Sequence, residues 1–256
     1  MMKRMTNSNP AAFAAVLALA AAATLHAADR DALLHIVQDQ CLPHWRQLHD
    51  AAPCTSIARD FAVLADRKGG AHYLLISTRT SRGIEDPVVL DPDAPNYFAA
   101  AWQARDRLSA AVGHAVSDDM VGLAINSARA RGQDQLHIHI ECQGATLQQA
   151  LRAAGGQIGE QWAPLPTLPY SYLARRVRGD SLDGANPFLL LAEGVPGARQ
   201  DMGAYTLVVA ATRLPDGASF VLLAGRSGTG LTAVLPDEGE VPPGETLLDS
   251  RCALPP

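Results

Sequence analysis

The chain has 256 residues, of which 48% are hydrophobic and 18% are charged, with a formal net charge of −5 at pH 7. This length and apolar content suffice for one compact domain and exclude a chain that is disordered throughout. The negative balance, without any run of Lys and Arg, excludes the clustered positive face that binds duplex nucleic acid, so we expect no nucleic-acid partner. One local pocket of Arg, His and backbone amides could still hold a small anionic substrate.

The first residues have the pattern of an export signal. Lys3 and Arg4 precede an uncharged stretch rich in Ala and Leu at 10–25, and small residues follow it. This stretch is shorter than the ~20 residues that cross a bilayer comfortably, which favours a cleaved signal peptide over a retained signal anchor. We expect residues 1–28 to be this signal and residues 29–256 to form one domain, exported to the periplasm or to the periplasmic face of the inner membrane.

Four cysteines in a chain with an export signal favour one or two disulfides. Cys41 and Cys54 enclose a short segment and are the simplest pair, but Cys142 and Cys252 bring the number of possible connectivities to three, and the sequence does not choose among them. Zinc coordination by these thiols is disfavoured, because no pair has the close spacing of a zinc knuckle.

A helix and a hairpin are predicted after the export signal. Apolar residues recur near helical spacing over 29–49, with Pro43 as a break or kink. Two apolar runs of strand length, 61–65 and 72–77, are joined by a turn rich in charge and Gly. These runs predict a hairpin.

The middle of the chain predicts a second helix and a second hairpin. A proline-rich loop over 86–96 precedes an Ala-rich run over 97–116 that has helical composition. Two further strand-like runs, 120–126 and 135–141, are separated by a polar connection.

The C-terminal part is expected to be mostly strand and loop after a helix over 146–153. Asp216 and Gly217 carry the Asp-Gly signal of a tight turn between strands. The apolar runs that we assign to this part are 170–174, 188–191, 205–211 and 219–223.

One strand motif carries chemistry. From Gln135 to Ile140 polar and apolar residues alternate strictly, so on a strand Gln135, His137 and His139 share one face, with neighbouring side chains ~7 Å apart. Two imidazoles at this spacing can contact one phosphate group, and a neutral imidazole can attack phosphorus and leave later from a phosphoramidate. The same pattern also fits two structural histidines.

A metal centre is the competing interpretation of this motif. A cupin-like site also begins with His-x-His, but it needs a Glu several residues later and then a further His. Here Glu141 follows His139 by two residues and shares its strand face, and no later histidine exists. We expect no metal ion and no cofactor, although upstream histidines could complete a metal site: His35, His44, His49, His72 and His114.

The string from Gln135 to Cys142 resembles the histidine-triad signature, with Gln135 where the first histidine usually stands. Longer stretches, at 73–87, 121–142 and from Met202 onward, are similar to the CDP-diacylglycerol pyrophosphatase family. The resemblance implies an α+β fold in which helices flank a histidine-triad-like antiparallel sheet and the C-terminal strands pack in the same domain. It also implies hydrolysis of CDP-diacylglycerol, a nucleotide-lipid substrate at a membrane surface, to CMP and phosphatidate.

On this resemblance His137 is the nucleophile that forms a nucleotidyl-histidine, and His139 donates to phosphate oxygens and assists the leaving group. Because Gln135 replaces the first histidine of the signature, the group that orients the second ring nitrogen of the nucleophile can differ from that of the family pattern. Six residues are candidate substrate ligands, although each also fits ordinary turn or loop chemistry: Asn126, Ser127, Gln133, Gln135, Arg79 and Arg82.

Two alternatives stay open. A nucleotidyl hydrolase or transferase acting on soluble dinucleotides would use the same His137 without an apolar groove for lipid. A non-catalytic periplasmic protein that binds lipid or nucleotide would have purely structural histidines.

Overall fold

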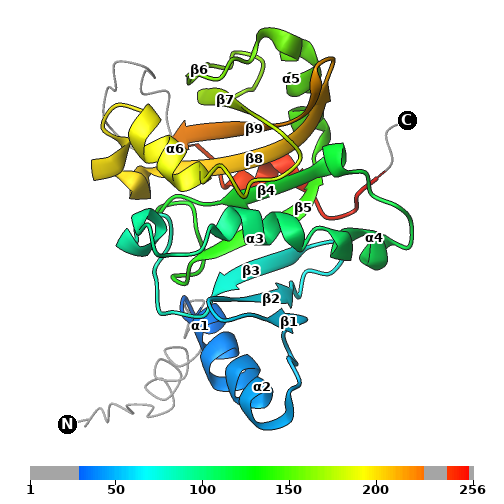
Figure 1. The fold of residues 1–256 in the computed structure, drawn as a ribbon, viewed down its shortest axis with the longest axis vertical. Helices are drawn as coiled ribbons and strands as arrows, with labels where there is room; N and C mark the ends of the chain where they lie inside the picture. Colours follow the sequence, from blue (N-terminus) through cyan, green and yellow to red (C-terminus); the bar gives the residue numbers. More distant parts are fainter. Residues whose placement is uncertain (1–28, 228–240, 254–256) are drawn as a thin grey trace, which may run out of the picture.

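The computed structural model describes residues 29–227 and 241–253, which form an α+β structure built on one antiparallel sheet (Figure 1). The predicted α+β class and antiparallel sheet are therefore confirmed. The export signal predicted at 1–28 lies outside the described residues.

The ten strands within the described residues follow the order β1-β2-β3-β5-β4-β8-β9-β7-β6, with β10 paired to β5 as well. Strand β10 joins β5 at Cys142 and Gln143, beyond Ile140, where the pairing of β5 with β3 ends. The strands are β1 (Ser56–Ile57), β2 (Phe61–Ala65), β3 (Tyr73–Ser77), β4 (Val121–Ile125), β5 (His137–Gln143), β6 (Ala163–Pro164), β7 (Tyr172–Arg178), β8 (Tyr205–Leu214), β9 (Gly217–Arg226) and β10 (Leu248–Asp249).

Six α-helices accompany the sheet in the described residues, with one π-helical turn (Ile36–Cys41) between the first two. The α-helices are α1 (Ala32–His35), α2 (Leu42–Leu48), α3 (Tyr97–Gln103), α4 (Asp106–Val112), α5 (Ala145–Ala154) and α6 (Pro187–Gly194). Short 3₁₀ turns lie at Pro87–Leu90, Asp118–Met120, Gly155–Gln157, Ala198–Gln200, Met202–Ala204 and Gly244–Leu247.

Helices α3 and α6 lie over one face of the sheet, in front of it in Figure 1, and bury a large apolar cluster there. The other face carries two smaller clusters. One packs α1 and the π-helical turn on β2 and β3, and the other packs α5 on β8 and β9. Strand β5 runs between these two smaller clusters, and on this face it presents His137 and His139 instead of aliphatic side chains.

The predicted helix over 29–49 is confirmed as one helical segment whose geometry changes along its length. It passes from α1 through the π-helical turn into α2, and Pro43 stands in the first turn of α2. Proline has no backbone N–H to donate. Just before Pro43 the backbone hydrogen bonds change from the π-helical to the α-helical pattern, and the helical segment continues.

Both predicted hairpins are confirmed, because β2 pairs with β3 and β4 pairs with β5, each antiparallel. The pairing of β3 with β5, which sets His139 opposite Leu74 and His137 opposite Ile76, joins the two hairpins into one sheet. The expected helix over 97–116 is present as two shorter helices, α3 and α4.

In the C-terminal part the helix over 146–153 is confirmed as α5, and three of the four apolar runs are confirmed as β7, β8 and β9. The fourth run departs from the expectation of strand and loop, because residues 188–191 belong to α6. The signals for that helix are local: the side chain of Asn186 accepts a hydrogen bond from the N–H of Phe188, and Pro187 occupies the first turn. The predicted turn at Asp216 and Gly217 connects β8 to β9.

Two disulfides, Cys41–Cys54 and Cys142–Cys252, cross-link the chain. The first is the pair that the sequence favoured and ties the π-helical turn to the segment before β1. The second holds the C-terminal segment against β5, the strand that carries the two histidines. As for membrane insertion, no helix within 29–227 or 241–253 has both the length and the apolar character that a span requires.

Replacing Cys142 and Cys252 by Ala is expected to destabilise the fold more than replacing Cys41 and Cys54. The partners are 110 residues apart in the Cys142–Cys252 bridge and 13 in the Cys41–Cys54 bridge, and loop-closure entropy in the unfolded chain predicts losses of about 5 and about 3 kcal/mol respectively. Urea unfolding of the two double variants under oxidising conditions measures the difference. A larger loss from the short bridge would contradict this ranking.

Candidate active site

A cavity of about 650 Å³ lies over the β3–β5 part of the sheet, on the face that carries the two histidines. Its lining combines ionisable and amide side chains with an apolar wall. The polar lining comprises Gln40, Asp66, Arg67, Lys68, Asn126, Gln133, His137, His139 and Glu245, and the larger apolar residues are Leu33, Ile36, Pro53, Leu64 and Leu74.

His137 is held in one tautomer by the backbone. Its Nδ1 lies 2.6 Å from the carbonyl oxygen of Gln135, which precedes β5 by two residues. A carbonyl only accepts hydrogen bonds, so Nδ1 carries the proton and Nε2 carries the lone pair. Burial lowers the pKa of His137, which keeps the imidazole neutral at neutral pH. The ring is therefore prepared to act as a nucleophile through Nε2.

The side chain of Gln135 hydrogen-bonds to backbone groups and does not line the cavity. Its Nε2 donates to the carbonyl oxygens of Ser77 and Arg79, both at 2.7 Å, and its Oε1 accepts from the N–H of Ser81 at 3.3 Å. These bonds fix the start of β5 against the segment that follows β3. Gln135 thus positions the carbonyl that orients His137.

His139 presents an unused nitrogen beside His137. The two rings lie 5.1 Å apart in an edge-on arrangement, and both line the cavity. His139 Nδ1 is 3.0 Å from Nε2 of His72, whereas its own Nε2 is buried without a hydrogen-bond partner in the described part of the chain. Burial, followed by the neighbouring histidines, lowers the pKa of His139 well below its usual range. A neutral ring in this position can donate one hydrogen bond to an incoming ligand.

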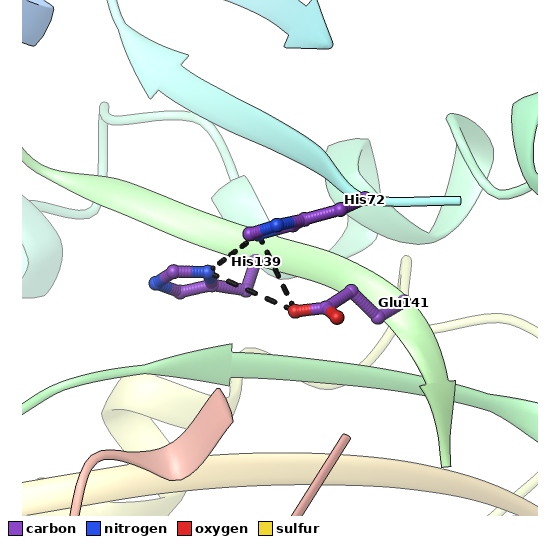
Figure 2. Close-up of side chains that lie close together, drawn as sticks. All are labelled: His72, His139 and Glu141. Atoms are coloured by element: carbon purple, nitrogen blue, oxygen red, sulfur yellow. Dashed lines mark hydrogen bonds and ion pairs between the residues drawn. The ribbon is translucent and has the colours of Figure 1, made fainter. Parts of the chain in front are cut away.

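Figure 2 shows His72 and Glu141 beside Nδ1 of His139. His72 precedes β3 by one residue and lies next to Glu141 because the β3–β5 register places Tyr73 opposite Ile140. The Nε2 of His72 and the Oε1 of Glu141 are 3.3 Å apart, and burial raises the pKa of Glu141 to about 8. Glu141 shares the face of His139, as the strand alternation predicted.

Asn126 and Glu245 close one side of the cavity. Asn126 accepts from the N–H of Gly244 at 2.7 Å and donates to Glu245 Oε2 at 2.6 Å, which anchors the 3₁₀ turn Gly244–Leu247. A Cβ at Gly244 would lie 2.9 Å from Cγ2 of Thr206, so only glycine lets this turn approach so closely. Asn126 lines the cavity, as expected of a site residue. It also anchors the turn Gly244–Leu247, which the sequence did not indicate as part of the site.

The other candidates from the connection between β4 and β5 differ in placement. Gln133 lines the cavity, and its amide bonds the N–H of Leu33 at 3.0 Å and the carbonyl of Asp29 at 2.8 Å. Ser127 is fully buried and does not line the cavity; its Oγ accepts from the N–H of Ala130, as expected of a turn residue.

The arginines predicted to bind phosphate lie away from the cavity. Arg79 is half exposed and pairs with Asp60 at 2.9 Å, and Arg82 is exposed, and neither side chain lines the cavity. The cations that do line it, Arg67 and Lys68, belong to the turn between β2 and β3. The sequence marked that turn as part of a hairpin, but only the β3–β5 pairing shows that it flanks the histidines.

Replacing Gln135 by Leu is expected to destabilise the fold by about 3 kcal/mol, because two carbonyl oxygens and one N–H lose their buried partner. Equilibrium urea unfolding measures this loss. The matched variant Gln133→Leu removes a more exposed amide with two bonds and is expected to cost less. Equal losses in the two variants would contradict the expectation that the buried hydrogen bonds of Gln135 stabilise the fold more than those of Gln133.

Comparisons with known proteins identify the family of the chain. The family model of CDP-diacylglycerol pyrophosphatase matches residues 28–255 of the chain. A curated CDP-diacylglycerol pyrophosphatase of Yersinia pestis is 44% identical over 207 residues, which cover 79% of each chain. The chain therefore belongs to the CDP-diacylglycerol pyrophosphatase family.

Proposed function

We propose that this chain hydrolyses CDP-diacylglycerol to CMP and phosphatidate through a covalent intermediate on His137. Its family membership supports the substrate and the hydrolytic reaction. The observation that carries the mechanism is the 2.6 Å hydrogen bond from His137 Nδ1 to the carbonyl of Gln135, because it leaves the lone pair on Nε2.

In the first displacement, Nε2 of His137 attacks the phosphorus that bears the cytidine. A P–N bond forms, and the bond from this phosphorus to the bridging oxygen breaks. The electron pair stays on that oxygen, so phosphatidate leaves as an anion. The ring becomes positively charged in the intermediate, and the carbonyl of Gln135, still accepting from Nδ1, stabilises this charge.

In the second displacement, water attacks the same phosphorus and loses a proton to the solvent. The P–N bond breaks, CMP is released, and His137 returns to its neutral form. The positive charge on the phosphorylated ring makes the imidazole a good leaving group. His139 assists both steps, because its buried Nε2 has no other hydrogen-bond partner in the described residues and can donate to the phosphoryl oxygens.

The diphosphate requires positive charge that two neutral histidines do not supply. Arg67 and Lys68 are exposed and line the same cavity, so they are the cations placed to contact the diphosphate. We assign them this role in addition to the amide of Asn126. The apolar wall, which includes Leu33, Leu64 and Leu74, accommodates the acylglycerol part of the substrate.

The location of the enzyme is part of the same proposal. The signal pattern at 1–28 supports export, and a lipid substrate supports action at the membrane surface from the periplasmic side. The alternating Gln135, His137 and His139 support a histidine-triad-like mechanism in which the backbone carbonyl of the first residue orients the nucleophile.

Quenching the reaction in alkali is expected to trap the cytidylyl group on the protein. With CDP-diacylglycerol labelled at the cytidylyl phosphorus, wild-type protein retains the label, because phosphoramidates survive base, whereas His137→Ala retains none and releases no CMP. His114→Ala, which alters a histidine outside the cavity lining, is the matched control and keeps both. In H₂¹⁸O the heavy oxygen is expected in CMP.

Heavy oxygen in phosphatidate would move the attack to the other phosphorus, and full activity of His137→Ala would remove this residue from the mechanism. CDP-glycerol, which keeps the diphosphate and lacks acyl chains, is expected to be a poorer substrate than CDP-diacylglycerol. A preference for CDP-glycerol or for dinucleotides would support the soluble-substrate alternative.

Replacing Arg67 or Lys68 by Gln is expected to lower kcat/KM for CDP-diacylglycerol about tenfold for each residue, since each loses a charge-assisted contact to phosphate. Steady-state kinetics in mixed micelles measures the effect. Arg199→Gln removes one positive charge from a residue outside the cavity lining and is expected to leave kcat/KM unchanged. An equal effect of all three changes would point to net charge alone.

A further inference from the structure

His72, His139 and Glu141 bring three ligand atoms to one buried point beside the proposed active site (Figure 2). Nε2 of His72 lies 3.0 Å from Nδ1 of His139 and 3.3 Å from Oε1 of Glu141, and the third side of the triangle measures 4.0 Å. All three side chains are buried. The proposed reaction uses the opposite nitrogen of His139 and neither of the other two residues.

The size of this triangle matches a metal site. In a tetrahedral site with bonds of ~2.0–2.1 Å, the ligand atoms lie about 3.3–3.5 Å apart. The three measured separations lie on both sides of this value, so shifts of a few tenths of an ångström would complete the coordination. Two imidazoles and one carboxylate are also a donor set that proteins use for zinc.

The second nitrogen of each imidazole faces a carboxylate. His72 Nδ1 is 3.9 Å from Asp66 Oδ1, and His139 Nε2 is 3.8 Å from Glu245 Oε2. A histidine that binds a metal through one nitrogen commonly directs the N–H of the other toward a carboxylate or carbonyl, which fixes its tautomer. Neither pair is within hydrogen-bond distance, but each carboxylate lies near the nitrogen whose N–H would point outward in a metal-bound histidine.

The burial of Glu141 is consistent with such an ion. Glu141 is buried between two neutral imidazoles, where a carboxylate is costly without a counter-charge, so burial favours its protonated form when no cation is bound. A divalent cation at the centre of the triangle supplies that charge. Nitrogen donors disfavour Mg²⁺ and Ca²⁺, which prefer oxygen ligands, and favour ions of the zinc type.

We propose that His72, His139 and Glu141 form a binding site for one divalent transition-metal ion of the zinc type. Three protein ligands leave a further coordination position for water or a substrate oxygen. Coordination through Nδ1 keeps the proton of His139 on Nε2, the nitrogen that the proposed function uses as a hydrogen-bond donor. The inference deepens the proposed function through this residue, but metal binding itself does not depend on the reaction.

The test measures metal content directly. Tag-free protein is freed of metal with a chelator, incubated with Zn²⁺, separated from unbound ion and measured by mass spectrometry for metals. Wild-type protein is expected to retain about one equivalent per chain and to gain thermal stability from Zn²⁺. Co²⁺ in its place is expected to give the visible absorption of a four-coordinate site.

Glu141→Gln, which keeps the shape of the side chain, and His72→Ala are expected to lose the bound metal, the Co²⁺ spectrum and the rise in Tm. His137→Ala and His114→Ala are the matched controls, since neither residue belongs to the triangle, and they are expected to retain all three. Circular dichroism of each variant without metal establishes that it is folded. If His72→Ala does not fold, the isosteric Glu141→Gln decides.

Wild-type protein that binds no Zn²⁺, or variants that bind as well as wild type, would overturn the metal site and leave His72 and Glu141 as hydrogen-bonding partners of His139. CMP release by metal-free protein at the wild-type rate would leave the proposed reaction intact while removing the ion from it. Stoichiometric Zn²⁺ without any CMP release would support the metal site and reject the proposed function.

Discussion

The structure depends on one constraint: strand β5 carries imidazole and carboxylate side chains through a sheet face that is otherwise apolar. The neighbouring strands cover that face with two hydrophobic clusters, one under α1 and one under α5, and His137, His139 and Glu141 stand between them. Buried polar groups without partners are destabilising. Several segments distant in sequence supply those partners, and their convergence produces the cavity.

In each of the two cavity histidines, a hydrogen-bonding partner occupies one ring nitrogen and leaves the other available. The carbonyl of Gln135 occupies Nδ1 of His137, and His72 occupies Nδ1 of His139, so both rings keep Nε2 for chemistry at the cavity. The 3₁₀ turn with Glu245 reaches the same region through Asn126. The disulfide between Cys142 and Cys252 holds the remaining C-terminal residues on β5, which links the stability of this strand to the order of the site.

The alternating pattern of β5 was sufficient to predict that His137 and His139 share a face, because side-chain period follows directly from strand geometry. The contribution of His72, by contrast, depends on the pairing of β3 with β5, two strands that are not consecutive in the chain. No local pattern specifies that pairing. Glu245 was equally inaccessible, because its position depends on tertiary contacts, among them the hydrogen bonds of Asn126, which lies 119 residues away in the sequence. The departure at α6 has a different origin: its apolar run has no clear period, and the capping side chain of Asn186 determined the helix.

The burial that makes the histidines effective also makes the anionic substrate difficult to bind. A neutral imidazole is a nucleophile, but it contributes no charge to hold a diphosphate, and Glu245 and Asp66 in the same lining repel it. The site must therefore obtain positive charge from outside the strand. The turn with Arg67 and Lys68 offers it at the surface, where charged groups keep their hydration, while the His72–His139–Glu141 triangle offers a place for it inside. In the proposed reaction the nucleophile and the positive charge therefore come from different segments, so the pKa of His137 is not tied to the affinity for phosphate.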